Sequence, residues 1–243
     1  MLVQPAYIGV IGEGGNRWVN GASMENKGFE FQLGYRGKIG ADLNYDFTGN
    51  IALYRNKITD LPESVVNNYG GNGTTDNILG HPWGSGYGYV ADGLFTTDDE
   101  VANSAEQLGK GLGRIRYKDL TGDGTIDSRD QTWILNPTPD FTYGFNFYFA
   151  YKGFDLTMFF QGVGGVDINV YGVKSMTDFW SINETGSNKG TRLLDAWSDS
   201  NPDSDIPALT STDRNNETRF STYFIENGSY MKLRNLQIGY TLP

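Results

Sequence analysis

Cysteine is absent from the 243 residues, and histidine occurs once, as His81. Without cysteine the chain forms no disulfide, thiolate metal site or cysteine nucleophile. A single histidine excludes a multi-histidine metal site. Any Ser-His-Asp triad would have to use His81, whose surroundings lack the strand-Ser-helix context of a nucleophile elbow. We find no convincing acid–base pair either, and we predict no catalytic residues and no enzyme activity.

Basic residues and long apolar runs are also scarce. The chain has 19 Lys and Arg against 29 Asp and Glu, a formal net charge of -10, which argues against a nucleic-acid partner because such a partner requires a basic face. No stretch of about 18 apolar residues is present, so the sequence predicts no transmembrane helix. Glycine (33 residues) and aromatic residues (14%) are abundant, which predicts an all-β protein with many turns.

The segment 140–165 carries the clearest pattern. Side chains of a strand alternate between its two faces, and here large apolar residues alternate with small or polar ones. We therefore predict strands at 140–151 and 154–163, joined by a tight turn at Lys152 and Gly153. The predicted apolar face consists of Phe141, Tyr143, Phe145, Phe147, Phe149, Tyr151, Phe154, Leu156, Met158 and Phe160.

The same alternation predicts three further strands. They lie at 27–37 and 39–55, joined by a turn near Gly37 and Lys38, and at 220–243. The second of these is longer than one membrane crossing requires, so it would project beyond a bilayer.

Two details refine these strands. The row Asp42, Asn44 and Asp46 lies opposite the apolar side chains, and because unpaired buried charges are costly, this face is predicted to meet water. Near the C-terminal end, apolar residues change parity, which indicates a β-bulge near Arg234 and Asn235.

Short turns alternate with long connections, which are predicted at 56–139 and 166–219. Outer-membrane barrels combine short periplasmic turns with long extracellular loops, on strands of about 9–11 residues that alternate apolar-out and polar-in. Soluble β-sandwiches more often have short turns at both ends. The pattern favours an antiparallel transmembrane β-barrel segment. The alternative is a soluble all-β carbohydrate-binding module stabilised by calcium.

The first long connection contains DLTGDGTIDSRD, which has the spacing of a 12-residue calcium loop with Gly124 at the sharp turn. Thr at the third position and Asp at the twelfth are weaker ligands than usual, and the flanking segments are predicted to be extended rather than helical. The alternative is a solvated Asp-Gly turn held by hydrogen bonds. The predicted ligands of a structural calcium ion are Asp119, Thr121, Asp123, Thr125, Asp127 and Asp130.

Upstream, the segment 80–95 mixes glycines with aromatic residues. Trp83, Tyr87 and Tyr89 are candidate substrate-binding residues, because aromatic rings on a loop stack on sugars or peptides. The alternative, that these rings pack into a small core of their own, is favoured. Residues 96–109 are predicted to include one short helix whose first turn is acidic.

Several stretches together resemble the C-terminal part of SusC/RagA-type TonB-dependent outer-membrane transporters. Their order and spacing match that family over nearly the whole chain apart from the long loops. The stretches are NKGFEF (26–31), GYVADGLF (88–95), GRIRYKDLTGDGTIDSRDQT (113–132), NPTPDFTYGFNFYFAYKGFDLTMFFQG (136–162) and LRNLQIGYTLP (233–243).

The resemblance implies a 22-stranded barrel with an N-terminal plug in the outer membrane of Bacteroidetes-type bacteria. It also implies a SusD-like surface lipoprotein that caps the barrel and helps to capture glycans or peptides, and import driven by the TonB complex. The segment 1–26 is predicted to be a loop without a signal peptide, and no TonB-contacting box or plug is recognised. Because an open set of strands would expose unpaired backbone to lipid, we expect this chain to be completed by the remaining barrel polypeptide.

Overall fold

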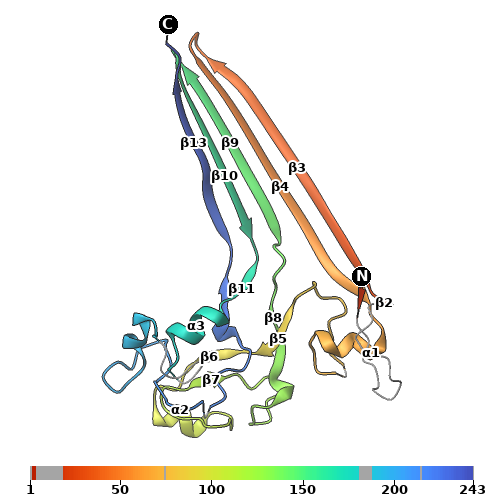
Figure 1. Cartoon of the computed structure of the whole chain (residues 1–243), viewed down its shortest axis with the longest axis vertical. Coiled ribbons are helices and arrows are strands. Elements are labelled where there is room, and N and C mark those ends of the chain that lie inside the picture. Colours follow the sequence, from red (N-terminus) through yellow and green to blue (C-terminus); the bar gives the residue numbers. More distant parts are fainter. Residues whose placement is uncertain (1, 4–18, 74, 181–187, 214, 243) are drawn as a thin grey trace.

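A computed structural model describes residues 2–3, 19–73, 75–180, 188–213 and 215–242. One long antiparallel sheet dominates the structure, and most of the other elements gather at one end of it (Figure 1). The predicted N-terminal loop without a signal peptide lies largely outside the described residues.

Five strands form the long sheet in the order β13-β10-β9-β4-β3, and each pairs antiparallel with its neighbours. With 11 residues each, β9, β10 and β13 are long enough to cross a membrane, whereas β3 (17 residues) and β4 (18 residues) exceed one crossing. The bounds are β3 (Ser23–Ile39), β4 (Leu43–Asp60), β9 (Phe141–Tyr151), β10 (Phe154–Gly164) and β13 (Tyr230–Tyr240).

The pairing register places the apolar residues of all five strands on one face. One row across the sheet is Tyr35, Phe47, Phe147, Met158 and Leu236. The rings of Phe47 and Phe147 in this row have centroids 5.0 Å apart. Cross-strand pairs of this kind stabilise a sheet.

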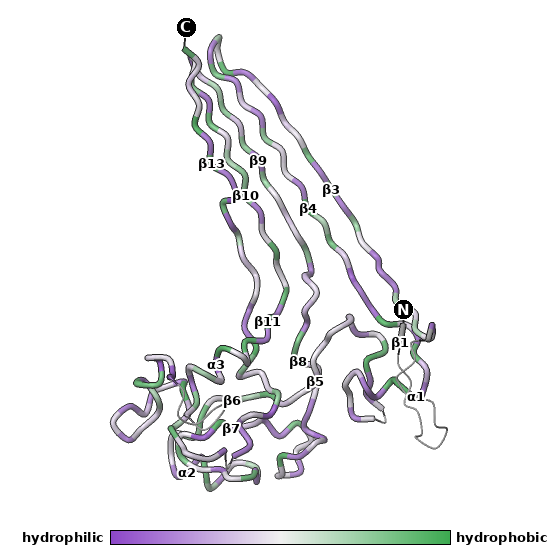
Figure 2. Tube along the Cα trace, viewed as in Figure 1, coloured by the Kyte–Doolittle hydropathy of each residue, from purple (hydrophilic) through white to green (hydrophobic). Residues whose placement is uncertain are grey.

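The opposite face is mainly polar, and one of its rows consists of Arg36, Asp46, Tyr148, Thr157 and Gln237. Figure 2 shows the resulting alternation of hydropathy along the strands. Of the row predicted to meet water, Asn44 and Asp46 lie on this polar face of β4, whereas Asp42 belongs to the turn that precedes the strand.

No second sheet covers the apolar face in the part of the chain that the structure describes. Phe29 on β3 is 63% exposed and Ile238 on β13 is 73% exposed. A soluble sandwich would bury this face, so the alternative of a soluble module does not fit the fold. The outer strands of this sheet, β3 and β13, each pair with a neighbour on one side only among the described residues, as expected for part of a barrel.

The short turns lie together at the far end of the sheet (Figure 1). The predicted turn at Lys152 and Gly153 is confirmed, and both residues have positive φ (46° and 85°), as a two-residue hairpin turn requires. The turn predicted near Gly37 and Lys38 is wrong. The chain reverses at residues 40–42, where Gly40 has a φ of 63°.

A three-residue turn explains this error. Ile39 pairs with Leu43, so the apolar residues keep the same odd parity on both sides of the turn. The alternation of apolar and polar residues therefore does not show where the chain reverses. As a result, the strands predicted at 27–37 and 39–55 extend to the bounds given above.

The C-terminal strand contains the predicted bulge. Phe159 pairs with Asn235 and Phe160 with Leu233, so Arg234 is the extra residue. The strand predicted at 220–243 nevertheless starts too early. Its first part forms a 3-10 turn and β12 (Ile225–Asn227), which pairs with β11 (Asp167–Asn169), because Phe224 turns into a buried core.

The two predicted long connections are folded rather than irregular. The predicted short helix is confirmed as α2 (Asp98–Asn103), whose cap residue Thr97 and third helical residue Glu100 form a capping box. Further elements are α1 (Glu63–Val66), β5 (Gly86–Tyr89), β6 (Ala91–Leu94), α2 (Asp98–Asn103), β7 (Ile115–Tyr117), β8 (Gln131–Leu135) and α3 (Tyr171–Thr177). Strands of three to five residues leave too little alternation for the sequence to reveal them.

Two small hydrophobic cores hold these elements. The first joins both connections and contains Leu94, Ile115, Tyr117, Ile126, Phe179 and Phe224. The second lies at the end of β4 and contains Ile58, Leu61, Val65 and Ile78. Among the described residues, no helix has the length and apolar character needed to cross a membrane.

Candidate functional site

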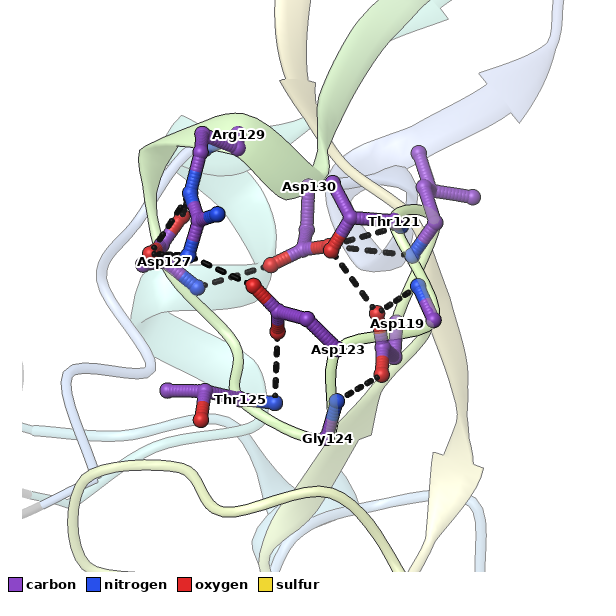
Figure 3. Close-up of polar contacts among 10 residues, drawn as sticks. Asp119, Thr121, Asp123, Gly124, Thr125, Asp127, Arg129 and Asp130 are labelled. Atoms are coloured by element: carbon purple, nitrogen blue, oxygen red, sulfur yellow. Dashed lines mark hydrogen bonds and ion pairs between the residues drawn. The ribbon is translucent and has the colours of Figure 1, made fainter.

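The Asp-rich loop joins β7 to β8 and is closed by its own hydrogen bonds (Figure 3). Asp119 accepts hydrogen bonds from the backbone N–H groups of Gly122 (2.6 Å) and Gly124 (2.8 Å). The hydrogen bond from Gly124 lowers the pKa of Asp119, and this effect outweighs burial, which acts to raise the pKa. The predicted sharp turn at Gly124 is present, with a φ of 83°.

Asp130 is fully buried and holds the two ends of this loop together. Its Oδ1 accepts hydrogen bonds from the backbone N–H groups of Leu120 (3.0 Å) and Thr121 (3.1 Å) and from the Thr121 hydroxyl (3.0 Å). Its Oδ2 accepts one from the backbone N–H of Asp127 (2.8 Å). Ile126 anchors the loop in the first core.

Arg129 lies between two of the predicted calcium ligands. Its Nη2 is 2.6 Å from Asp123 Oδ2 and 2.7 Å from Asp127 Oδ2. The hydrogen bonds from Arg129 lower the pKa of Asp127, and the two carboxylates raise the pKa of Arg129. The guanidinium group thus supplies positive charge where a cation would be held.

In this arrangement the carboxylate oxygens of the predicted ligands contact hydrogen-bond donors rather than a common cation position. Asp119 and Asp130 direct their oxygens at N–H groups, and Thr125 donates its backbone N–H to Asp123 (3.0 Å). In the described part of the chain, no group of three or more His, Asp or Glu side chains is placed to hold a metal ion. Calcium binding by this loop stays a prediction, and it would require Arg129 to move away.

The three aromatic candidates each pack against a different ring. Tyr87 packs edge-on against Trp133, with centroids 5.1 Å apart, and burial together with Asp76 raises its pKa. Tyr89 borders the first core and lies 5.7 Å from the ring of Tyr117. Trp83 remains 44% exposed, with its ring 5.1 Å from that of Tyr69. Their role in substrate binding stays a prediction.

A buried polar network, which the sequence analysis missed, ties the two long connections together. Arg114 Nη1 is 2.8 Å from Glu217 Oε2, and Glu217 Oε1 accepts the backbone N–H of Ile115 (3.0 Å). Burial raises the pKa of Glu217, against the opposing attraction of Arg114. Gln107 donates to Asn215 Oδ1 (3.1 Å) and extends the network.

Arg219 adds a second tie between the connections. Its guanidinium carbon lies 4.8 Å from the ring centroid of Tyr89 and 4.5 Å from that of Tyr117. Tyr89 also donates its backbone N–H to the carbonyl of Phe220 (3.0 Å). Isolated polar residues in irregular segments have no periodicity, so no sequence signal pointed to these contacts.

Comparison with known proteins identifies the wider group. The chain is 32% identical over 251 aligned residues to TonB-dependent receptor P3 of Formosa agariphila, an alignment that covers 98% of this chain and 23% of that receptor. It is 26% identical to TonB-dependent receptor SusC of Bacteroides thetaiotaomicron, covering 91% of this chain and 21% of SusC.

The chain belongs to the SusC/RagA-type TonB-dependent receptors. No protein-family model matches it. Within these receptors, the solved RagAB peptide transporter has the same fold over the whole chain, with a TM-score of 0.71, 23% identity and coverage of 25% of that protein's chain. The predicted barrel fold is thereby confirmed. The chain spans about a quarter of the length of these receptors.

Proposed function

We propose that this receptor segment is part of a transporter that imports glycans or peptides across a bacterial outer membrane, together with a SusD-like surface lipoprotein. One observation supports this most directly: a single apolar face continues over five strands and lies opposite a mainly polar face. A barrel wall between lipid and a watery lumen requires this division. The proposal assigns no catalytic residue.

The two ends of the sheet have different roles in this proposal. The short turns at 40–42 and 152–153 face the periplasm, and the folded connections face outside, where they meet substrate and the lipoprotein. The relatives are about four times longer than this chain. The other barrel strands and the contact with the TonB complex are therefore proposed to come from further polypeptide.

Fractionation of the cells that make the protein tests this proposal. The full-length polypeptide, followed by an antibody against residues 188–213, is expected in the outer membrane and to co-purify with a surface lipoprotein after detergent extraction. Deletion of its gene should abolish uptake of one class of oligosaccharide or peptide. A polypeptide confined to the soluble fraction contradicts the proposal.

A further inference from the structure

A shallow hollow lies where the loop end of the sheet meets the first long connection. Its volume is about 320 Å³, within the range of roughly 300–1,000 Å³ of small-molecule sites. The residues on which its chemistry depends are Trp83, Tyr54, Asn26, Asn56, Pro137 and Pro139. Among the residues that the structure describes, no Asp, Glu, Lys, Arg or His side chain lines it.

The alternation of the sheet produces this uncharged lining. Asn26 pairs with Asn56 on the same face as the polar rows of the sheet. The neighbouring pair, Glu25 and Lys57, points to the opposite face, where Glu25 also forms an ion pair with Lys27 at 2.8 Å. Glu25, Lys27 and Lys57 are thus kept on the other side of the sheet from the hollow.

Hydrogen bonds and ring packing fix the position of Trp83 in the absence of a ligand. The backbone N–H of Trp83 donates to Asn56 Oδ1 (2.9 Å), and Asn56 Nδ2 donates to Asn26 Oδ1 (2.6 Å). Tyr69 supports the Trp83 ring, which keeps 44% of its surface exposed. Asn26 Nδ2 donates to no partner among the described residues and remains available to a ligand.

We propose that this hollow binds a neutral oligosaccharide. An indole ring offers a flat apolar surface to the C–H face of a sugar, and carboxamides both donate to and accept from hydroxyl groups. A charged peptide would lose hydration here without gaining an ionic partner, which disfavours it. This inference rests on the proposed function, since the hollow faces the side of the sheet assigned to the lumen.

Binding to the full-length transporter in detergent tests the inference. The probes are a pool of short neutral oligosaccharides and a pool of tryptic peptides of similar mass, measured by native mass spectrometry and then by titration. We expect members of the saccharide pool to bind. Trp83→Ala should weaken their affinity about tenfold, equal to about 1.4 kcal/mol, and Asn26→Ala should weaken it with the fold unchanged.

Trp180 provides a matched control, because it is 43% exposed and lies in the other long connection. Trp180→Ala should leave saccharide affinity unchanged. Binding of peptides instead of saccharides, saccharide affinity indifferent to Trp83→Ala, or binding of neither pool overturns the inference.

Uptake by cells separates this inference from the proposed function. If the transporter imports substrate but affinity does not depend on Trp83, the proposed function stands and the inference fails. If saccharides bind through Trp83 but are not imported, the binding site stands and the transport proposal fails.

Discussion

Arg114 and Glu217 form a buried ion pair at 2.8 Å although they lie 103 positions apart in the sequence. Arg114 belongs to the first long connection and Glu217 to the second. Because each connection leaves the sheet from a different hairpin, this pair helps to join the two connections into one folded unit at one end of the sheet (Figure 1).

Glu217→Ala should separate the two connections. Removing one partner of a buried ion pair leaves an uncompensated charge, which costs about 3–5 kcal/mol. We expect faster hydrogen exchange in residues 107–117 and 215–224 of the full-length protein, with exchange of β9 and β10 unchanged.

Glu106→Ala is the control for this experiment. Glu106 forms an exposed ion pair with Lys110 at 2.7 Å, and such surface pairs contribute little. Equal exchange in the two variants would show that the buried pair does not hold the connections together.

Asp130→Ala should loosen the Asp-rich loop more than Asp123→Ala does. Asp130 is fully buried, and its loss leaves N–H groups of the loop without an acceptor, at about 1–3 kcal/mol for a buried unsatisfied group. Asp123 contacts the exposed side chain of Arg129. Limited proteolysis within 118–131 measures the difference, and equal cleavage of both variants contradicts this ranking.

Calcium binding by the same loop predicts a dependence on chelator. If the ion is bound, chelation should make the wild-type loop sensitive to protease, and Asp123→Ala should be sensitive in either condition. Arg129→Ala should increase calcium affinity, because the competing guanidinium group is removed. Protease resistance of the wild type that is the same with and without chelator would rule out a structural calcium ion.

The stability of the first turn of α2 should decrease at acidic pH. Hydrogen bonds from the backbone and hydroxyl of Thr96, then the ion pair with Arg116, lower the pKa of Glu100 from 4.5 to about 2. The ionised form is favoured in the folded state, so its stabilisation is present above pH 4.5 and is lost as the pH falls from 4.5 through 2.

Hydrogen exchange of residues 96–104, corrected for the intrinsic effect of pH, measures this loss. Glu100→Gln keeps an acceptor at the cap but cannot ionise, so its exchange should change less over the same pH range. The same pH response in both proteins would contradict the assignment to Glu100.

The two-faced sheet could be predicted from the sequence because its register preserves parity. Phe47 of β4 and Phe147 of β9 are opposite one another, and each belongs to its own run of alternating residues. The bulge at Arg234 could also be predicted, since a change of parity is its direct consequence. The turn at 40–42 could not, because it leaves parity unchanged.

The contacts made by the loops could not be predicted from the sequence for a different reason. The spacing of the Asp-rich loop is compatible with a calcium ion, and only the fold shows that Arg129 approaches Asp123 and Asp127. The partners Arg114 and Glu217 likewise meet only after both connections have folded. Neither contact follows from local propensity.

Adjacent residues of β13 test most directly which face of the sheet contacts lipid. Leu236→Cys and Gln237→Cys place one thiol on each face of an exposed strand, and the chain has no other cysteine. After replacement of any cysteine elsewhere in the full-length polypeptide, a bimane label on each variant is measured in membranes that contain brominated lipid. We predict strong quenching for Leu236→Cys and weak quenching for Gln237→Cys, which should instead react with a charged, membrane-impermeant maleimide. Equal quenching at both positions, or the reverse order, would contradict the proposed barrel wall.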